Sequence, residues 1–189
     1  MTGSSGTDLR SLRDRPFDLL REIERRSKAA LAGAKGDDVD VEEWVGIGFR
    51  LADEQFVVAR DDIHEVLMVP ALIARVPGAK SWIRGLANVR GHLLPIMDLK
   101  LFLGAGRVVG QRDARVLVIK SAEISAGLIV DEVFGFRRFL DTERSAEAPQ
   151  TLVGCDQFLM GTYERGLEHW PIFSVERLER SEEFQRAAA

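Results

Sequence analysis

The segment GLANVRGHLLPIMDL, residues 85–99, places an arginine among apolar residues and closes an apolar run with an aspartate. Arg90 precedes Gly91, and the run that follows contains Pro95 and ends at Asp98 and Leu99. An isolated buried charge is strongly unfavourable. Because the residues around Arg90 are expected to be buried, its cation needs a partner, a ligand or a binding surface.

Length and composition are typical of one globular domain or two small ones sharing a core. The chain has 189 residues, 46% of them hydrophobic, and a formal net charge of −4. This charge argues against a general nucleic-acid binder, which would carry a basic face. No apolar run approaches the length of a membrane span, and the first residues lack the apolar core of a signal peptide. The single cysteine, Cys155, excludes an internal disulfide and fits a cytoplasmic protein.

Four regions follow one another along the chain. Residues 1–15 are polar and are expected to form a flexible tail, and residues 179–189 are expected to form a C-terminal tail. Between them, 16–42 is predicted to be a helical extension with a linker, and 43–178 to be a β-rich domain. The helix is predicted from a single apolar stripe: Phe17, Leu20, Ile23, Ala30 and Leu31.

Short runs rich in β-branched and aromatic residues dominate the domain. The predicted strands are 44–51, 55–60, 63–69, 93–99, 114–120, 125–136, 158–163 and 169–175. Tight turns are expected at 52–54 and 121–123. Ser174 is expected to cap a last short helix, with Val175 and Leu178 facing inward.

The two halves of the domain resemble each other, which suggests an internal repeat. Ile63, Glu65 and Val66 match Val130, Glu132 and Val133 at an offset of 67. At an offset of 76, the residues that match Phe158, Gly161, Pro171, Ile172 and Val175 are Trp82, Gly85, Pro95, Ile96 and Leu99. The repeat predicts two similar small antiparallel β units packed against each other.

Two segments bounded by glycines, 85–91 and 161–166, are expected to be loops. A glycine allows a partner to approach the backbone closely, and binding residues concentrate on loops. These segments are therefore candidate binding surfaces.

Catalytic and cofactor motifs are not recognisable. The three histidines, His64, His92 and His169, lack metal-ligand spacing, so neither a metal nor a cofactor is expected. Asp98 and Asp131 each follow an apolar strand and could form an acid–base pair, although an aspartate at a strand end more often accepts hydrogen bonds from the next turn. Cys155 is more simply a packed side chain than a nucleophile.

The segment 76–104 resembles the signature of CheW domains. The matching residues are Gly85, Asn88, Arg90, Gly91, Pro95, Asp98 and Leu99. Ala87 and Met97 are conservative departures from the pattern. The resemblance extends over residues 43–178. Within the family, the extension before residue 40 and the segment WVGIGFRL are most similar to adaptors that control type IV pili.

The resemblance implies a fold of two five-stranded SH3-like β-barrels and a role without catalysis. Such an adaptor joins a methyl-accepting chemoreceptor to a CheA-type histidine kinase and is recruited from the cytoplasm to membrane-bound receptor arrays. For this chain the implied pathway is twitching motility, with a flagellar or other chemosensory pathway as the alternative. A kinase-associated variant is disfavoured because no ATP-binding glycine boxes precede the domain.

The resemblance also assigns binding residues. The receptor-facing groove would include Ile63, Gly85, Arg90, Val116 and Gly127, and the receptor- and kinase-binding set adds Glu65, Asn88 and Gly91. By the same resemblance, Arg90 pairs with Glu65 at the groove edge. Reasoning from the residues alone leaves Asp98 and Glu132 as equally acceptable partners.

Overall fold

The computed structural model describes residues 43–108, 112–120 and 125–186, all within the unit Glu42–Ala189. The expected tail at 1–15, the helical extension and linker at 16–42 and the turn at 121–123 lie outside the described residues. Among the described helices, none has the length and apolarity needed to cross a membrane.

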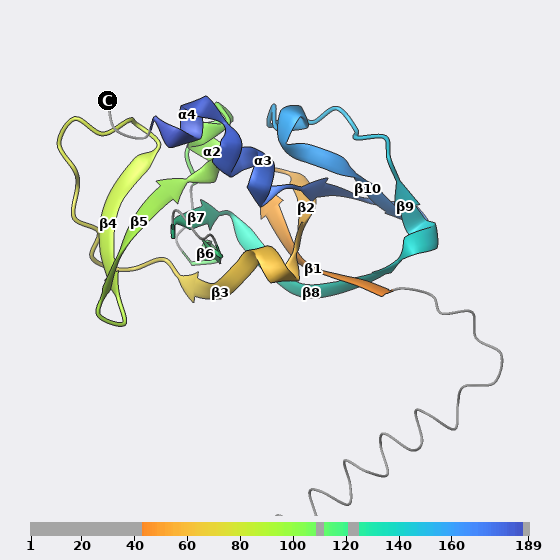
Figure 1. The fold of residues 1–189 in the computed structure, drawn as a ribbon, viewed down its shortest axis with the longest axis horizontal. Helices are drawn as coiled ribbons and strands as arrows, with labels where there is room; N and C mark the ends of the chain where they lie inside the picture. The colour runs from red at the N-terminus through yellow and green to blue at the C-terminus, as the bar shows by residue number, and fades with distance from the viewer. Residues whose placement is uncertain (1–42, 109–111, 121–124, 187–189) are drawn as a thin grey trace, which may run out of the picture. The chain divides into compact units, whose positions relative to one another are not determined.

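The described chain is mainly β, as predicted, and forms two sheets (Figure 1). The strands are β1 (Glu43–Leu51), β2 (Glu54–Ala59), β3 (Ile63–Met68), β4 (Ile83–Val89), β5 (His92–Asp98), β6 (Arg115–Ile119), β7 (Gly127–Val130), β8 (Glu132–Leu140), β9 (Arg144–Ser145), β10 (Leu159–Arg165) and β11 (Glu168–Phe173). The helices are α2 (Leu99–Phe102), α3 (Val175–Arg180) and α4 (Glu182–Gln185), with short 3-10 turns η2 (Arg60–Asp62), η3 (Asp141–Glu143) and η4 (Asp156–Phe158).

Each sheet contains strands from both halves of the sequence. The six-stranded sheet has the order β8-β1-β2-β11-β10-β9, and the five-stranded sheet has the order β3-β6-β7-β5-β4. The first half contributes the hairpin β1–β2 to the six-stranded sheet and β3, β4 and β5 to the five-stranded sheet. The second half contributes the hairpin β6–β7 to the five-stranded sheet and β8, β9, β10 and β11 to the six-stranded sheet. The halves join through parallel pairs, β11 with β2 and β5 with β7.

The repeat predicted from the sequence is confirmed by the strand register. Leu86 pairs with Pro95 in the hairpin β4–β5, and Thr162 pairs with Pro171 in the hairpin β10–β11. Both members of the second pair lie 76 positions after those of the first. The two hairpins are therefore equivalent, which accounts for the offset between their glycines and prolines.

Each of these hairpins leads into a capped helix. The Asp98 carboxylate accepts a hydrogen bond from the Leu101 amide at the start of α2, and the Ser174 hydroxyl accepts one from the Arg177 amide at the start of α3. A side-chain oxygen at this position satisfies an amide that the helix leaves unpaired. The expected turn-capping role of Asp98 and helix-capping role of Ser174 are confirmed.

The two glycine-bounded segments expected as loops lie largely in strands β4 and β10, so that expectation is wrong. Gly85 has φ 135° and Gly161 has φ 132°, and each sits at an irregularity in its hairpin. A Cβ on either glycine would overlap a carbonyl oxygen, that of Ala74 or that of Ser145. Because these glycines have no side chain, another segment of the backbone can pack against them. The segment after β3 pairs with β4 in this way, and β9, which follows β8, pairs with β10.

The main hydrophobic core contains residues of both sheets and of all three described helices, which lie along the junction in Figure 1. Phe184 of α4 is 2% exposed, stacks on Trp82 with ring centroids 6.0 Å apart and meets Phe102 edge-on. Ordered packing therefore continues beyond residue 178, the expected end of the domain.

Candidate protein-binding groove

A groove of about 310 Å³ opens between β3 and β8, each of which is an edge strand of its own sheet. Its lining includes Ile63, Glu65 and Val66 from β3, Ile47 from β1 and Phe136 from β8. Among the residues that the structure describes, no further strand pairs with the outer edge of β3 or of β8. Such edges leave backbone hydrogen-bonding groups available beside the side chains that line the groove.

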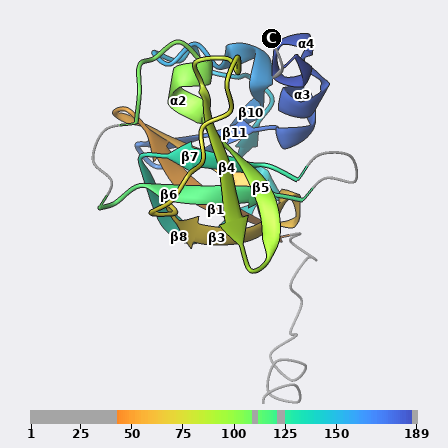
Figure 2. The same ribbon diagram turned by 90° about the vertical axis from the view of Figure 1, so that its left-hand side faces the viewer.

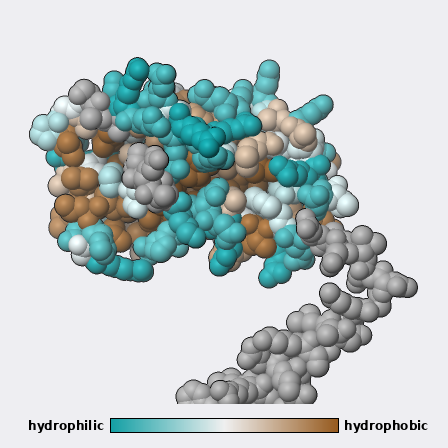
Figure 3. Space-filling model, viewed as in Figure 1, coloured by the Kyte–Doolittle hydropathy of each residue, from teal (hydrophilic) through white to brown (hydrophobic). Residues whose placement is uncertain are grey.

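Phe136 is the most exposed aromatic side chain of this groove, at 65%, and Val66 beside it is 39% exposed. Figure 3 shows a separate concentration of apolar residues, at the end of the molecule formed by β4 and β5 of the five-stranded sheet. Exposed aromatic side chains within a polar rim are typical of protein-binding sites.

Phe136 was not predicted as a site residue. The register between β1 and β8 shifts where Gly135 has φ 86°, and such a bulge redirects the side chains that follow it. The sequence FGF at 134–136 carried a signal, a glycine inside an aromatic strand pattern.

Arg90 lies in the two-residue turn of the hairpin β4–β5. Val89 pairs with His92, and the turn residues Arg90 and Gly91 have φ of 51° and 88°. Positive φ at both central residues defines a type I′ turn, whose twist matches that of paired strands. The Gly91 amide donates to Asn88 Oδ1 at 2.9 Å, which fixes the turn.

The ion pair between Arg90 and Glu65 is present. Arg90 Nη2 lies 2.9 Å from Glu65 Oε2, with side-chain exposures of 74% and 20%. The hairpin β4–β5 carries Arg90 in its turn (Figure 2), and the ion pair with Glu65 joins that turn to β3, with the Arg90 cation exposed to solvent. An exposed pair of this kind contributes about 0–1 kcal/mol to stability. Its geometric effect is to hold the hairpin turn beside the groove.

The remaining predicted site residues divide by burial. Asn88 and Gly91 are exposed at the turn, whereas Ile63, Gly85, Val116 and Gly127 are buried. A Cβ on Gly127 would collide with the Val116 side chain, so these two residues pack against each other inside the five-stranded sheet. Ile63 also lines the groove, whereas the buried Gly85, Val116 and Gly127 can influence a partner only through the shape of the strands they support.

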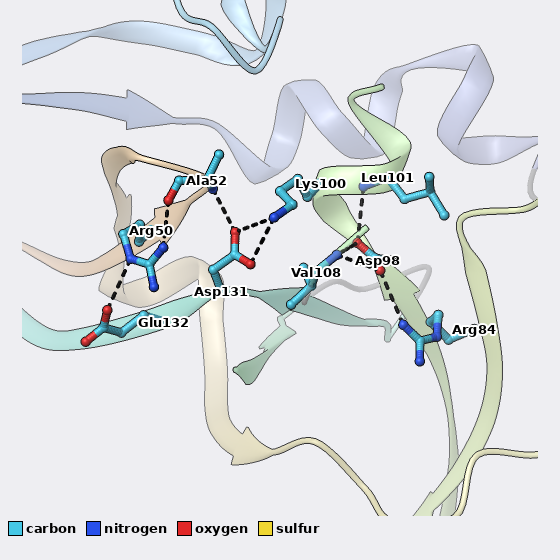
Figure 4. Close-up of polar contacts among 9 residues, drawn as sticks. All are labelled: Arg50, Ala52, Arg84, Asp98, Lys100, Leu101, Val108, Asp131 and Glu132. Carbon is cyan, nitrogen blue, oxygen red and sulfur yellow. Dashed lines mark hydrogen bonds and ion pairs between the residues drawn. The ribbon is translucent and has the colours of Figure 1, made fainter. Parts of the chain in front are cut away.

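Asp98 and Asp131 are held in separate structural contacts rather than as an acid–base pair (Figure 4). Asp98 is 0% exposed and accepts from the Val108 amide and from Arg84 Nη1 at 3.4 Å, besides capping α2. Asp131 is 6% exposed, and both of its oxygens lie 3.1 Å from Lys100 Nζ.

Neither aspartate lines the groove. Among the described residues, no hydrogen bond joins Asp98 to Asp131, and none joins either aspartate to Cys155. Within the described part of the chain, no group of three or more His, Cys, Asp or Glu could hold a metal ion.

Cys155 is fully buried, as expected for a packed side chain. Burial raises the pKa of its thiol to about 11, and the carboxylates of Asp156 and Glu54 act in the same direction, while a hydrogen bond with Thr151 opposes them. The thiolate is the nucleophilic form, so a thiol with this pKa is unreactive at neutral pH.

We expect native protein at pH 8 to react with a thiol-specific disulfide reagent far more slowly than protein unfolded in urea. Cys155→Ser should lower the free energy of unfolding by about 1 kcal/mol and leave partner binding intact. Reaction of the folded protein at the unfolded rate would show that the thiol is accessible.

The model of the CheW-like domain family matches residues 45–183, and the chain belongs to this family. Among its relatives, Protein PilI of Pseudomonas aeruginosa is 39% identical over 169 residues, which cover 89% of this chain and 94% of PilI. Chemotaxis protein CheW of Helicobacter pylori is 28% identical over 85% of this chain and 93% of its own length. The crystal structure of scaffolding protein TtCheW from Thermoanaerobacter tengcongensis has a TM-score of 0.62 and 26% identity, and the match covers 71% of this chain and 86% of that one. The resemblance seen in the sequence is confirmed.

Proposed function

We propose that this protein is a non-enzymatic adaptor that couples a methyl-accepting chemoreceptor to the regulatory domain of a CheA-type histidine kinase. The observation that carries the proposal is that the family's signature segment folds into a hairpin whose Arg90 is held by Glu65 at a groove with an exposed aromatic side chain. The scaffolding role named for TtCheW supports it.

The pathway that the similarity favours is control of type IV pili and twitching motility. The identity to PilI, 39% over nearly all of PilI, exceeds the 28% to the Helicobacter pylori chemotaxis protein. A flagellar or other chemosensory pathway is the alternative. In either case the adaptor acts in the cytoplasm and is recruited to membrane-bound receptor arrays, without inserting into the membrane or binding nucleic acid.

Each sheet is proposed to curve into a small SH3-like barrel. The support is the chain after β3, where Ala74 forms a bridge with Leu86 on the opposite edge strand β4. In the other sheet Ser145 of β9 pairs with Thr162 of β10. In each sheet the segment that follows one edge strand, β3 or β8, therefore pairs at the opposite side of the same sheet, as closure requires.

The proposed receptor contacts are Glu65 and the exposed Phe136, which line the groove, and Arg90, which lies beside it. Asn88 and Gly91 set the conformation of the turn, and the buried Ile63, Gly85, Val116 and Gly127 shape the strands behind it. The general test is a pulldown of this protein against the receptors and CheA-type kinases of its source organism. Capture of neither class would overturn the adaptor assignment.

Arg90→Ala and Glu65→Ala are each expected to weaken receptor binding while changing the free energy of unfolding by less than about 1 kcal/mol, because the pair is exposed. The double variant should bind no worse than the weaker single variant, since the two residues act as one contact. The measurements are receptor affinity by calorimetry and stability by urea unfolding.

Arg144→Ala is the matched control, because Arg144 is an exposed arginine on β9 of the other sheet. Phe136→Ala should weaken the same binding about tenfold or more, as expected for an aromatic anchor. If folded Arg90→Ala and Phe136→Ala both bind the receptor normally, the groove is not the receptor site.

A further inference from the structure

A second pocket, of about 270 Å³, is lined by four basic side chains: Arg75, Lys80, Arg84 and Arg107. This concentration of positive charge contrasts with the formal net charge of −4 of the chain. Three apolar side chains, Val76, Ala79 and Ile83, and the polar Ser81 complete the lining.

The positive charge of this pocket is largely uncompensated. Arg84 is anchored from behind by buried Asp98, whose carboxylate also accepts two backbone amides (Figure 4). Arg75, Lys80 and Arg107 are exposed, and none has a carboxylate partner among residues 43–108, 112–120 and 125–186. Four cations therefore line one pocket, and the only carboxylate paired with any of them among the described residues is that of Asp98 with Arg84, so an anionic ligand would reduce their mutual repulsion.

The basic pocket is separate from the groove. Arg84 lies near the start of β4, and Arg90 lies one residue beyond its end. Six residues of extended strand span about 20 Å at roughly 3.3 Å per residue. One ligand side chain cannot contact both places, so the pocket needs a ligand of its own.

We propose that this pocket binds an acidic segment of a protein partner, one that offers carboxylate side chains together with at least one apolar side chain. The four cations would pair with the carboxylates. The apolar side chains of the lining would contact the apolar side chain of the ligand, and one of them, Val76, is 42% exposed. A small oxyanion would leave these apolar side chains unused. The volume also lies below the range of about 300–1,000 Å³ typical of small-molecule sites. The inference rests on the proposed function only in that an adaptor needs more than one protein-binding surface.

The test uses a short fluorescein-labelled peptide of alternating glutamate and valine. The full chain is titrated into the peptide, and binding is measured as the rise in fluorescence anisotropy. Binding is expected at low salt and should weaken as salt rises, because exposed charges are screened. Lys80→Glu combined with Arg107→Glu should weaken binding about tenfold or more, and Arg144→Glu, the same charge change on β9, should leave it within about twofold. Both pocket residues are exposed, so thermal unfolding should show that the variant folds.

Equal binding by the wild type and the Lys80→Glu, Arg107→Glu variant would overturn the proposal. Displacement of the peptide by inorganic phosphate at equal concentration would also overturn it, because the site would then be one for small oxyanions. Phe136→Ala should leave peptide binding unchanged, and loss of binding in that variant would place the peptide in the groove. Peptide binding that survives in a chain with no receptor affinity would separate this inference from the proposed function.

Discussion

Gly85→Ala is expected to lower the free energy of unfolding by about 3 kcal/mol or more. Gly85 has φ 135°, a conformation that side chains rarely adopt, and its new Cβ would overlap the carbonyl of Ala74. The Ala74 amide and carbonyl both bond to Leu86, so the strand cannot retreat without breaking that bridge. Urea denaturation followed by tryptophan fluorescence measures the loss.

Gly78→Ala is the matched control for this change. Gly78 also has positive φ, 74°, but nothing lies within 4 Å of the Cβ that alanine would add. Its cost should be limited to the backbone conformation, about 1 kcal/mol. Gly161→Ala should behave like Gly85→Ala, since its Cβ would meet Ser145 in the same way. Equal losses for Gly85→Ala and Gly78→Ala would show that the close backbone approach contributes nothing.

Asp131→Ala is expected to cost about 3–5 kcal/mol, the range for removing one partner of a buried ion pair. Asp131 is 6% exposed, and its loss leaves the charge of Lys100 without this partner, although the Lys100 side chain is only 11% exposed. The same carboxylate accepts the Ala52 amide at 2.7 Å and holds the turn after β1, where Ala52 has φ 54°. Thermal and urea unfolding should both report the change.

The double variant Asp131→Ala, Lys100→Met should be more stable than the sum of the two single changes predicts, because neither charge is then left buried alone. Asp61→Ala is the control, since Asp61 forms an exposed pair with Arg60 and its loss should cost no more than about 0.5 kcal/mol. If the effects of the double variant are strictly additive, the two side chains are not coupled.

The sequence predicted the ends of strands well where the function of a residue is set by its immediate neighbours. Ser174 and Asp98 were assigned as caps because a short oxygen-bearing side chain at a strand end satisfies free amides, and the structure confirms both. The repeat was also detectable, since equivalent hairpins require glycine and proline at equivalent positions.

Non-local contacts explain where the sequence misled. A glycine that admits another strand's backbone has the same local signature as a glycine in a loop, so Gly85 and Gly161 were assigned to loops. The apolar neighbours of Arg90 left a partner, a ligand and a binding surface all open for its cation, and its exposure follows from a type I′ turn that forms when β4 pairs with β5. Phe136 was missed because its exposure depends on a bulge set by pairing with β1.

The contacts of the candidate site also depend on residues that are distant in the sequence. Choosing Glu65 as the partner of Arg90 required the family resemblance, because Glu65 lies on β3 and Arg90 in the turn that follows β4, and β3 and β4 are opposite edge strands of the sheet. Glu132, the equivalent residue of the repeat, pairs with Arg50 instead. The basic pocket was not predicted: Arg75, Lys80 and Arg84 lie within ten residues of sequence, but only the fold shows that they line one pocket and that Arg107 joins them.

The reciprocal exchange of hairpins has an evolutionary and a kinetic consequence. If the chain arose by duplication, its ancestor was a homodimer whose subunits swapped their first hairpin, and fusion made that swap intramolecular. Neither half could then have become an independently folding module, because each sheet would lose a hairpin if the halves separated. Folding must wait for residues far apart in sequence to meet, which slows it, and the two sheets should form and melt together.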